Sequence, residues 1–408
     1  MNFLRDPISF IIDWFVGLLA STGLPPAWVQ FISTLVGAFI LATGAMLFVI
    51  FLIWYERKLI GRIQDRFGPN RLGPWGLIQP IADMLKIFTK EYITPIGADK
   101  VPYNLAPILA VGAVLMVWAV IPFTVTVVGA DLSVGFLFIL AVGALGEMGF
   151  ILAGLGSNNK YALLGAFRSV AQLISYEVPM VISALLPVMF AGTLSVTGIV
   201  QSQDVWFILL APAAALVFFI ASVAEIGRAP FDLVEAESEL VAGYNIEYSG
   251  LKFGMFFVAE FLHAFTMALI FATIFLGGWR GPGAQEYPIL GFVYLIIKTA
   301  AVYFITILFR GTLPRFRIDQ MMDLNWKVLT PLSLAVVMSI ALVDRLVAGS
   351  GTLVRILALL AVNGLLLFVT DWAIKRFNPS VRREVGSRDR PVARAEVLPT
   401  PSDPGAQG

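Results

Sequence analysis

The sequence predicts an all-α protein: a polytopic integral membrane helix bundle with about nine transmembrane helices and an amphipathic surface helix in the first cytoplasmic loop. Three observations predict this class. The 408 residues are 58% hydrophobic and only 13% charged, a composition typical of membrane proteins. Apolar runs long enough to cross roughly 30 Å of hydrocarbon recur along the chain. The basic residues gather in alternate segments between these runs, as the positive-inside rule describes.

The chain begins with an apolar segment that is too short for a confident span. This segment, "ISFIIDWFVGLLA" at 8–20, carries Asp13 and is followed by Pro25 and Pro26. A basic region before the segment is missing, so an interfacial helix is favoured over a signal peptide. We therefore assign residues 1–27 to an N-terminal interfacial segment.

Residues 28–375 form the predicted transmembrane helical domain. Its nine apolar runs lie at 28–55, 104–128, 133–155, 167–191, 204–224, 252–277, 289–309, 331–348 and 353–374. We find no internal repeat among them, which argues against an inverted-repeat transporter. Residues 376–408 are rich in Pro, Arg and Asp and are predicted to be a basic, disordered tail.

The distribution of basic residues predicts the orientation of the bundle. Most of the 28 Lys and Arg residues fall in the segments 56–103, 156–168, 225–252, 310–327 and 375–394. These segments lie on one side of the membrane if the spans are as predicted. The positive-inside rule then places the N-terminus outside and the C-terminus in the cytoplasm.

The composition also excludes several kinds of site. The chain has no cysteine and a single histidine, His263, which excludes iron–sulfur ligands, thiolate zinc sites and haem held by two histidines. It contains neither a G-x-G-x-x-G loop nor a basic cluster interleaved with aromatic residues, so nucleotide and nucleic-acid binding are not expected. Any metal, flavin or iron–sulfur cluster of a redox reaction must therefore lie on other chains. His263 is most simply a packing residue, and it receives no role.

The first long inner loop, "ERKLIGRIQDRFGPNRLGPWGLIQPIADMLKIFTKE" at 56–91, contains a predicted amphipathic helix. Two Gly-Pro pairs predict turns, and Pro80 suits the first turn of a helix. The apolar residues Ile81, Met84, Leu85 and Phe88 share one face, opposite Asp83, Lys86 and Lys90. The helix either lies on the bilayer with its charges solvated, or roofs an opening through which a lipophilic ligand enters.

The second inner loop, "RAPFDLVEAESELVAGYNIEYSG" at 228–250, is rich in acids. Its five carboxylates are Asp232, Glu235, Glu237, Glu239 and Glu247. On a helix, Asp232, Glu235 and Glu239 share one face. A solvated acidic face is one interpretation. The other is a protonatable lining, because clustered carboxylates raise one another's pKa and can hold protons near neutral pH.

Ionisable residues inside apolar runs are the strongest functional signal in the sequence. Glu147, Glu177, Glu260 and Lys298 lie well within predicted spans. Each costs roughly 2.5–3.5 kcal/mol at the membrane centre, so each must face the bundle interior, pair or stay neutral. They form either a proton path or a buried pair that fixes helix packing, with Lys298 as a partner for one of the acids.

Small residues and a proline surround two of these acids. Gly143, Gly146 and Gly149 flank Glu147 and predict the close approach of another helix. Glu177 precedes Pro179, whose missing N–H frees the carbonyl of Ser175, and we expect this carbonyl to be a hydration point.

Four long motifs together resemble one known family. They are the first inner loop quoted above, "NKYALLGAFRSVAQLISYEVP" from Asn159, "AEIGRAPFDLVEAESELVAGYNIEYSG" from Ala224 and "LPRFRIDQMMDLNWK" from Leu313. The sequence resembles one membrane subunit of proton-pumping NADH:quinone oxidoreductase (respiratory complex I), the H subunit of bacteria, which is numbered 1 in mitochondria. The resemblance covers about residues 30–345. The ninth span and the basic tail depart from the shortest family members.

The resemblance implies a role within a bacterial cell inner or plasma membrane complex, with catalysis only in the assembled enzyme. The expected partners are the peripheral-arm quinone-module subunits, small and antiporter-like membrane subunits, and membrane lipid. The substrate is a quinone, ubiquinone or menaquinone, reduced by an iron–sulfur cluster in a partner subunit. The implied residues of the quinone chamber or its entrance are Arg57, Arg66, Asp83, Arg228 and Arg310.

The resemblance also implies an acidic path from that chamber towards the antiporter-like subunits. The matching residues are Glu177, Glu225, Asp232, Glu235, Glu237, Glu239, Glu247 and Glu260. Glu147, which matches bacterial members better than mitochondrial ones, and the intramembrane Lys298 complete the candidate proton path.

Three alternatives remain open at this point. The chain also resembles the related membrane subunit of membrane-bound hydrogenase complexes, although its intact Arg-rich, Gly-Pro first loop favours the quinone enzyme. An autonomous ion antiporter would transport ions as a purified chain. A purely structural anchor for a peripheral arm would tolerate neutralisation of the buried acids.

Overall fold

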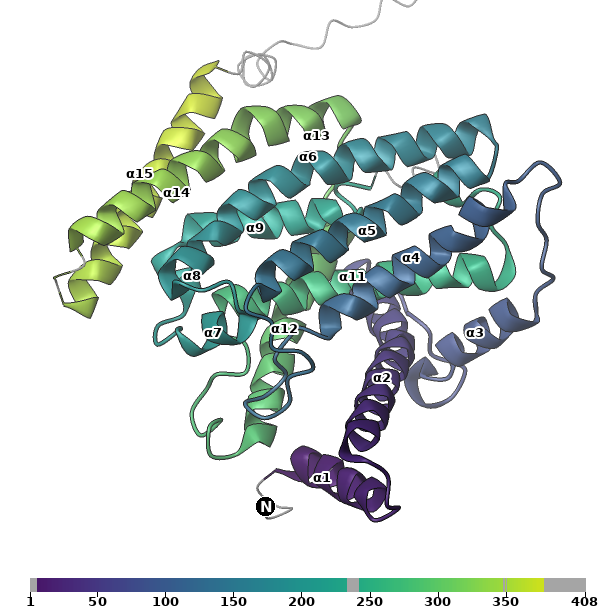
Figure 1. Ribbon diagram of the computed structural model, residues 1–408. Coiled ribbons are helices and arrows are strands. Elements are labelled where there is room, and N and C mark those ends of the chain that lie inside the picture. Colours follow the sequence, from purple (N-terminus) through teal and green to yellow (C-terminus); the bar gives the residue numbers. More distant parts are fainter. Residues whose placement is uncertain (1–5, 233–241, 348, 350, 378–408) are drawn as a thin grey trace, which may run out of the picture. The chain divides into compact units, whose positions relative to one another are not determined.

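A computed structural model describes residues 6–232, 242–347, 349 and 351–377 of the chain (Figure 1). Within these ranges the regular elements are helices, and the only bridge of β type is an isolated one between Pro122 and Val128. The predicted all-α class is therefore confirmed.

The helices follow one another along the described chain as α1 (Pro7–Ala20), α2 (Pro26–Ile63), α3 (Gln79–Thr89), α4 (Lys100–Trp118), α5 (Gly135–Gly156), α6 (Lys160–Ala191), α7 (Val196–Gln201), α8 (Phe207–Leu210), α9 (Pro212–Glu225), α11 (Gly250–Phe275), α12 (Pro288–Thr312), α13 (Ile318–Leu324), α14 (Thr330–Val347) and α15 (Thr352–Phe377). Short 3₁₀ turns lie at η1 (Pro74–Gly76) and η2 (Gly243–Asn245), and a π-helical turn, η3 (Asn325–Leu329), joins α13 to α14.

Eight described helices are long and apolar enough to cross a membrane, with α13, η3 and α14 counted as one. They correspond to eight of the nine predicted spans. The remaining prediction, 204–224, was wrong in form, because this segment is broken into α8 and α9 at Ala211 (φ −134°, ψ 61°). Pro212, which has no N–H to continue the preceding turn, follows the break directly.

Two predicted span boundaries differ from the helix ends in the structure. The second span was predicted to reach residue 128, but α4 ends at Trp118. Beyond it the hydroxyl of Thr124 accepts hydrogen bonds from the N–H groups of Thr126 and Val127, which closes a tight turn instead of continuing the helix. In contrast, α2 continues to Ile63, eight residues past its predicted end.

Both predicted short helices are present. The N-terminal α1 is capped by Asp6, whose carboxylate accepts from the N–H of Ser9 at 3.1 Å; α1 ends at Ala20, before the proline pair, and α2 begins at Pro26. In the first long loop, α3 has Pro80 in its first turn. The interfacial position of α1 stays a prediction.

Small residues set the closest helix contacts in the bundle, in which α4, α5 and α6 lie side by side (Figure 1). A Cβ added at Gly149 of α5 would lie 3.0 Å from the carbonyl oxygen of Ala106 in α4. One added at Gly154 would lie 2.3 Å from the Cβ of Ala166 in α6. Such contacts let the backbones of membrane helices approach closely. The α11 helix packs against α4, α12 and α2 and completes the bundle around the site.

Two prolines inside spans free backbone carbonyls that later segments of the chain satisfy. Pro179 in α6 frees the carbonyl of Ser175, which accepts from Nδ2 of Asn325 at 2.5 Å. A side chain of η3 therefore supplies one donor to this carbonyl, and its role as a hydration point stays a prediction. Similarly, Pro107 in α4 frees the carbonyl of Tyr103, which accepts from the hydroxyl of Tyr248 at 3.2 Å.

The chain divides after Leu366 into two compact units, which are described separately. In the second unit the described residues end with α15 at Phe377, where Lys375 and Asp371 form an exposed ion pair at 2.6 Å. Arg376 and Phe377, predicted to open the basic tail, still belong to α15. The rest of that tail lies outside the described residues, and its disorder stays a prediction.

Candidate functional site

A cavity of about 90 Å³ lies among α4, α5, α6, α9 and α11. Its acidic lining residues are Glu147 of α5, Glu177 of α6, Glu225 of α9 and Glu260 of α11, and His263 of α11 lies beside them. Because one water needs about 10–15 Å³ of such space, the cavity has room for several. The fold thus gathers, from four helices, four acids that sequence reasoning had proposed separately.

The glycines beside Glu147 have different structural roles. The predicted close approach holds at Gly149, which faces the backbone of α4, and at Gly146, where an added Cβ would lie 3.4 Å from the Cβ of Ala113. Gly143 instead lines the cavity, with nothing within 4 Å of an added Cβ. The small residues therefore both bring α5 against α4 and leave open space near Glu147.

Glu225 and His263 face each other across α9 and α11. Nε2 of His263 lies 3.8 Å from Oε1 of Glu225. Oε2 of Glu225 is buried and has no hydrogen-bond partner among the described residues. Glu225 therefore lines the cavity with one carboxylate oxygen near His263 and the other free of described partners.

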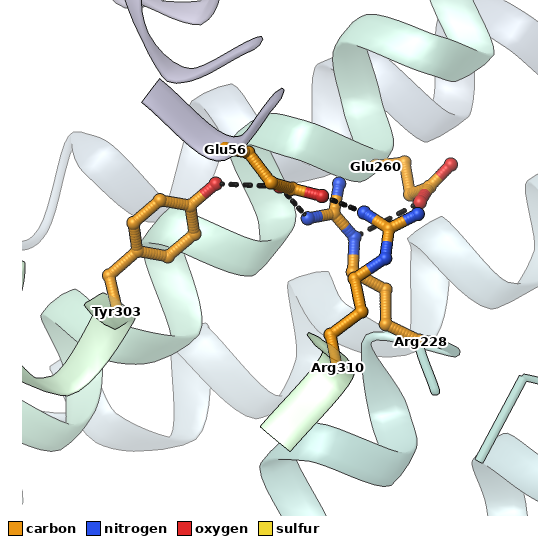
Figure 2. A network of polar contacts seen from close by, with 5 residues as sticks. All are labelled: Glu56, Arg228, Glu260, Tyr303 and Arg310. Carbon is orange, nitrogen blue, oxygen red and sulfur yellow. Dashed lines mark hydrogen bonds and ion pairs between the residues drawn. The ribbon is translucent and has the colours of Figure 1, made fainter. Parts of the chain in front are cut away.

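Next to the cavity lies a buried ion network made of Glu56, Arg228, Glu260, Tyr303 and Arg310 (Figure 2). Arg228 and Arg310 both form ion pairs with the carboxylate of Glu56, and the hydroxyl of Tyr303 donates to it at 3.2 Å. Nε of Arg228 also donates to Oε1 of Glu260 at 3.1 Å. The side chains of Glu56 and Arg228 are each only 3% exposed.

Four elements position this network. Glu56 lies on α2, Glu260 on α11, and Tyr303 and Arg310 on α12, whereas Arg228 lies in the loop after α9. Nε2 of Gln172 holds that loop onto α6 by donating to the carbonyls of Ala224 at 2.6 Å and Phe231 at 2.8 Å.

The network is balanced in charge, since two guanidinium groups meet two carboxylates. Desolvating each charge costs several kcal/mol, so removing one partner leaves a large penalty on the others. The guanidinium of Arg228 also stacks over the ring of Phe261, 4.3 Å from its centre.

Sequence reasoning missed Glu56. The predicted span ended at residue 55, so Glu56 was assigned to a solvated loop, but the helix continues to Ile63 and turns this side chain inwards. One signal was available: an acid at the end of a span, in a segment otherwise biased towards positive charge, needs a partner.

The implied quinone-site residues fall into two groups. Arg228 and Arg310 belong to the buried network. Arg57 and Asp83 instead form an ion pair at 2.5 Å between α2 and α3, with side chains 42% and 28% exposed. Nε of Arg66 donates to the side chain of Gln64 at 2.8 Å, an exposed and local contact.

The predicted apolar face of α3 points away from the rest of the described chain. Ile81, Leu85 and Phe88 are 45%, 60% and 55% exposed. The helix contacts α11 through Ile87, which would lie 2.8 Å from a Cβ added at Gly254. The exposed face is therefore available to lipid, a ligand or a partner.

The other implied acids lie outside the cavity lining or outside the described residues. Oε1 of Glu247 accepts from Nδ2 of Asn159 at 2.7 Å, and its backbone carbonyl accepts from the hydroxyl of Tyr103 at 2.8 Å. Asp232 is the last residue before the gap. The acids that lie outside the described residues are Glu235, Glu237 and Glu239.

Lys298 has partners other than the one expected. Its Nζ donates to the backbone carbonyls of Gly278 at 3.0 Å and Arg280 at 2.7 Å, and lies 5.3 Å from the centre of the Trp206 ring. It forms no ion pair with an acid in the described part of the chain, so the expected pairing was wrong. The loop after α11 supplies enough carbonyls to satisfy the ammonium group.

No group of three His, Cys, Asp or Glu side chains that could hold a metal ion occurs in the described ranges. The site is instead a set of buried carboxylates and guanidinium groups around a small cavity. Such a set can hold protons, bind water and respond to a charge that appears nearby.

The family model "NADH dehydrogenase" matches residues 36–341. The chain is 50% identical over 287 residues to the NADH-quinone oxidoreductase H subunit of Dehalococcoides mccartyi strain CBDB1, covering 70% of this chain and 80% of that protein. It is 50% identical over 294 residues to the NADH-quinone oxidoreductase H subunit numbered 2 of Geobacter sulfurreducens, covering 70% and 88%. It is 45% identical over 323 residues to the H subunit of Geobacillus sp. strain WCH70, covering 79% and 97%.

Proposed function

The chain belongs to the NADH dehydrogenase family, and from this premise we propose that it couples quinone reduction to proton translocation within an NADH-quinone oxidoreductase. It is an integral membrane subunit of that enzyme, as the names of its relatives and its apolar helices indicate. The names also favour this enzyme over the membrane-bound hydrogenases.

The proposed quinone chamber uses the buried network. Arg228 and Arg310 offer guanidinium groups that can stabilise negative charge on a quinone headgroup as it is reduced. Glu56 holds both arginines in place and, together with Glu260, balances their charge before the substrate arrives. The exposed pair Arg57 and Asp83, with Arg66, lies at the proposed entrance, and the apolar face of α3 suits an isoprenoid tail.

The observation that carries the proposal is that Glu260 belongs both to the ion network and to the cavity lining. Its carboxylate pairs with Arg228 in the network, and the same residue lines the cavity that contains Glu147, Glu177 and Glu225. Two unit charges 4 Å apart interact by about 4 kcal/mol at an effective dielectric constant near 20. A charge that appears beside Arg228 therefore changes the affinity of Glu260 for a proton, and through it that of the cavity acids.

The proton path continues, in this proposal, through His263 and the cavity acids and along the acidic loop. The loop contribution of Asp232, Glu235, Glu237, Glu239 and Glu247 rests on the family resemblance. Lys298 receives no support from the geometry as a member of this path, because it is engaged by backbone carbonyls.

The remaining parts of the enzyme complete the proposal. The electron-delivering iron–sulfur cluster and the nucleotide site belong to partner subunits of the peripheral arm. The positive-inside bias supports an N-terminus outside and a C-terminus in the cytoplasm, which puts α3, the acidic loop and the arginine network on the side where a peripheral arm binds.

The test is the variant Glu260→Gln, compared with Asp13→Asn, which neutralises an exposed acid on α1. In membrane vesicles we expect Glu260→Gln to lower quinone-coupled NADH oxidation and proton pumping by on the order of 10²-fold, as for loss of a general acid–base group. NADH oxidation by a hydrophilic acceptor, which bypasses quinone, stays normal in both variants.

Complex content is checked on a native gel, so that loss of assembly is distinguished from loss of function. Full quinone-coupled turnover and pumping by an assembled Glu260→Gln enzyme would overturn the proposal. Transport of ions by the purified chain alone would favour an autonomous antiporter instead.

A further inference from the structure

The break in the fifth span leaves two backbone groups without partners from their own helices. The residue at the N-cap position of α9 is Ala211, which has no side chain able to cap. The N–H of Ala213 in the first turn of α9 and the carbonyl of Leu210 at the end of α8 are the groups concerned. Since α9 has 14 residues, it spans only about 21 Å at 1.5 Å per residue, which is too short to cross roughly 30 Å of hydrocarbon without α8.

One side chain of α15 satisfies both groups. Oδ1 of Asn363 accepts from the N–H of Ala213 at 3.1 Å, and its Nδ2 donates to the carbonyl of Leu210 at 3.2 Å. Asn363 is 1% exposed. It therefore acts as the N-cap that α9 lacks, supplied from a helix 150 residues further along the chain.

The contact also attaches residues 352–366 of α15 to the break. Asn363 lies one turn after Leu359, which is fully buried, and Nδ2 also donates to the carbonyl of Leu359 at 2.7 Å. Other residues of the helix are open, with Leu353, Leu357 and Leu365 between 61% and 76% exposed. In hydrocarbon the freed N–H and carbonyl groups of a broken helix must find protein partners. A carboxamide offers both a donor and an acceptor for them, whereas an apolar side chain offers neither.

We propose that Asn363 is a positioning residue, which locks the broken fifth span and thereby holds Glu225 in the cavity. Ala213 and Glu225 lie near opposite ends of the same helix, so a shift at the first moves the second. Asn363 lies beyond residues 36–341 that the family model matches, so the family resemblance does not assign it this role. The functional part of this inference rests on the proposed function, whereas the lock itself does not.

The lock is tested by hydrogen–deuterium exchange on the assembled complex. Asn363→Leu keeps the size of the side chain and removes both hydrogen bonds. We expect the amides of residues 207–215 to exchange about tenfold faster, since one buried hydrogen bond contributes roughly that factor. Asn363→Asp has the shape of asparagine, and its neutral carboxyl group can accept from the N–H of Ala213 and donate to the carbonyl of Leu210, giving up only the bond to Leu359 within α15, so exchange stays near that of the parent chain. Leu360→Ala, an adjacent change at a partly exposed position of α15, is the control.

The positioning role is tested on the same samples by activity. Asn363→Leu should lower quinone-coupled turnover and pumping severalfold at unchanged hydrophilic-acceptor activity, while Asn363→Asp restores both. Unchanged exchange in Asn363→Leu overturns the lock. Faster exchange with full coupled turnover overturns the positioning role. If Asn363→Leu does not assemble, the test rests on Asn363→Asp. Parent-like exchange and turnover in that variant support the lock, and faster exchange together with lost turnover overturns it.

The two proposals fail differently. If Glu225→Gln retains full coupled turnover, the proposed function of the cavity is wrong, although the exchange result for the lock stands. If Glu225→Gln abolishes coupled turnover but Asn363→Leu does not affect it, the function holds and the positioning role is wrong.

Discussion

Glu56 and Arg57 are neighbours on α2, yet their ion pairs lie in opposite environments. Glu56 is 3% exposed and receives two guanidinium groups and a tyrosine hydroxyl, whereas Arg57 is 42% exposed and has a single partner, Asp83. Adjacent residues on a helix point about 100° apart, so one faces the bundle and the other the surface. The same chemical interaction is therefore placed in two dielectric environments by a single step along the chain.

The difference teaches that burial, rather than the number of ion pairs, decides what a charge contributes. An exposed pair contributes roughly 0–1 kcal/mol, because water screens it and both side chains lose conformational freedom. A buried pair contributes little net stability relative to apolar residues, but breaking it costs about 3–5 kcal/mol. Removing one member of the Glu56 network is therefore expected to cost far more than removing one member of the exposed pair.

The largest expected effect comes from breaking the buried network with Glu56→Gln. Arg228 then keeps Glu260, whereas Arg310, whose side chain is 31% exposed, loses its ion-pair partner, and one positive charge of the network is uncompensated. We expect a loss of about 3–5 kcal/mol, a large part of a typical stability of 5–15 kcal/mol. Thermal unfolding of the detergent-purified complex and its amount on a native gel measure the effect. A midpoint equal to that of an Asp83→Asn variant would contradict the comparison.

The double variant Glu56→Gln with Arg310→Gln sharpens the same comparison. It returns the network to one cation, Arg228, and one anion, Glu260, so the uncompensated charge disappears. We expect the double variant to recover about 0.5–3 kcal/mol relative to Glu56→Gln alone, as coupled neighbours do in double-mutant cycles. The measurement is the same unfolding midpoint for the parent, both single variants and the double variant. Simple addition of the two single losses would show that the two charges act independently.

Asp6 gives an intermediate case, because it is buried but paired with neutral donors. Burial pushes the pKa of Asp6 up, but hydrogen bonds from Ser9 and Thr126 outweigh it and hold the pKa below its ordinary value of 3.8. A carboxyl group with a lowered pKa contributes stability above its ordinary pKa, and loses it as the pH falls through the lowered value.

We expect Asp6→Asn to weaken the attachment of α1 by about 1 kcal/mol near neutral pH, as for the loss of an N-cap. Hydrogen exchange of residues 7–20, compared between parent and variant at each pH, measures this. The difference should disappear in strong acid, below the lowered pKa. A difference that persists there would mean that the charge of Asp6 is not involved.

The smallest expected effect belongs to the exposed pair. Arg57→Gln should change stability by less than about 1 kcal/mol, and the change should shrink further in high salt, where the screening length falls to about 3 Å. Unfolding midpoints at low and high salt test this independently of any role of Arg57 at a quinone entrance. A loss as large as that of Glu56→Gln would remove the distinction between the two regions.

Much of the fold could be predicted because spans depend on local composition. Apolar length located eight spans, and the pattern Ile81, Met84, Leu85 and Phe88 located α3. The break at Ala211 could not be predicted in the same way. The segment 204–224 is rich in apolar residues, so its composition does not reveal the break. The N–H of Ala213 and the carbonyl of Leu210 find their hydrogen-bond partner in Asn363, about 150 residues away in sequence.

The candidate site was predictable as a set of residues but not as an arrangement. Intramembrane acids are costly, so Glu147, Glu177 and Glu260 were identifiable without coordinates. Their convergence on one cavity depends on how four helices pack. Glu56 was missed because its role comes from two arginines that lie more than 170 residues later, and the carbonyls that satisfy Lys298 carry no signal in composition.

The carbonyls freed by Pro107 and Pro179 have a consequence for biosynthesis. Their partners are Tyr248 and Asn325, so each carbonyl accepts from a side chain roughly a third of the protein downstream, across separations of 145 and 150 residues. At translation rates of about 5–20 residues per second, α4 and α6 must wait on the order of 10 s for these groups. During that interval the ribosome-bound chain carries polar defects in two inserted helices, which the insertion machinery or its water has to accommodate. Synthesis of Tyr248 and Asn325, rather than insertion of α4 and α6, is therefore the earliest step at which these two carbonyls can find their partners.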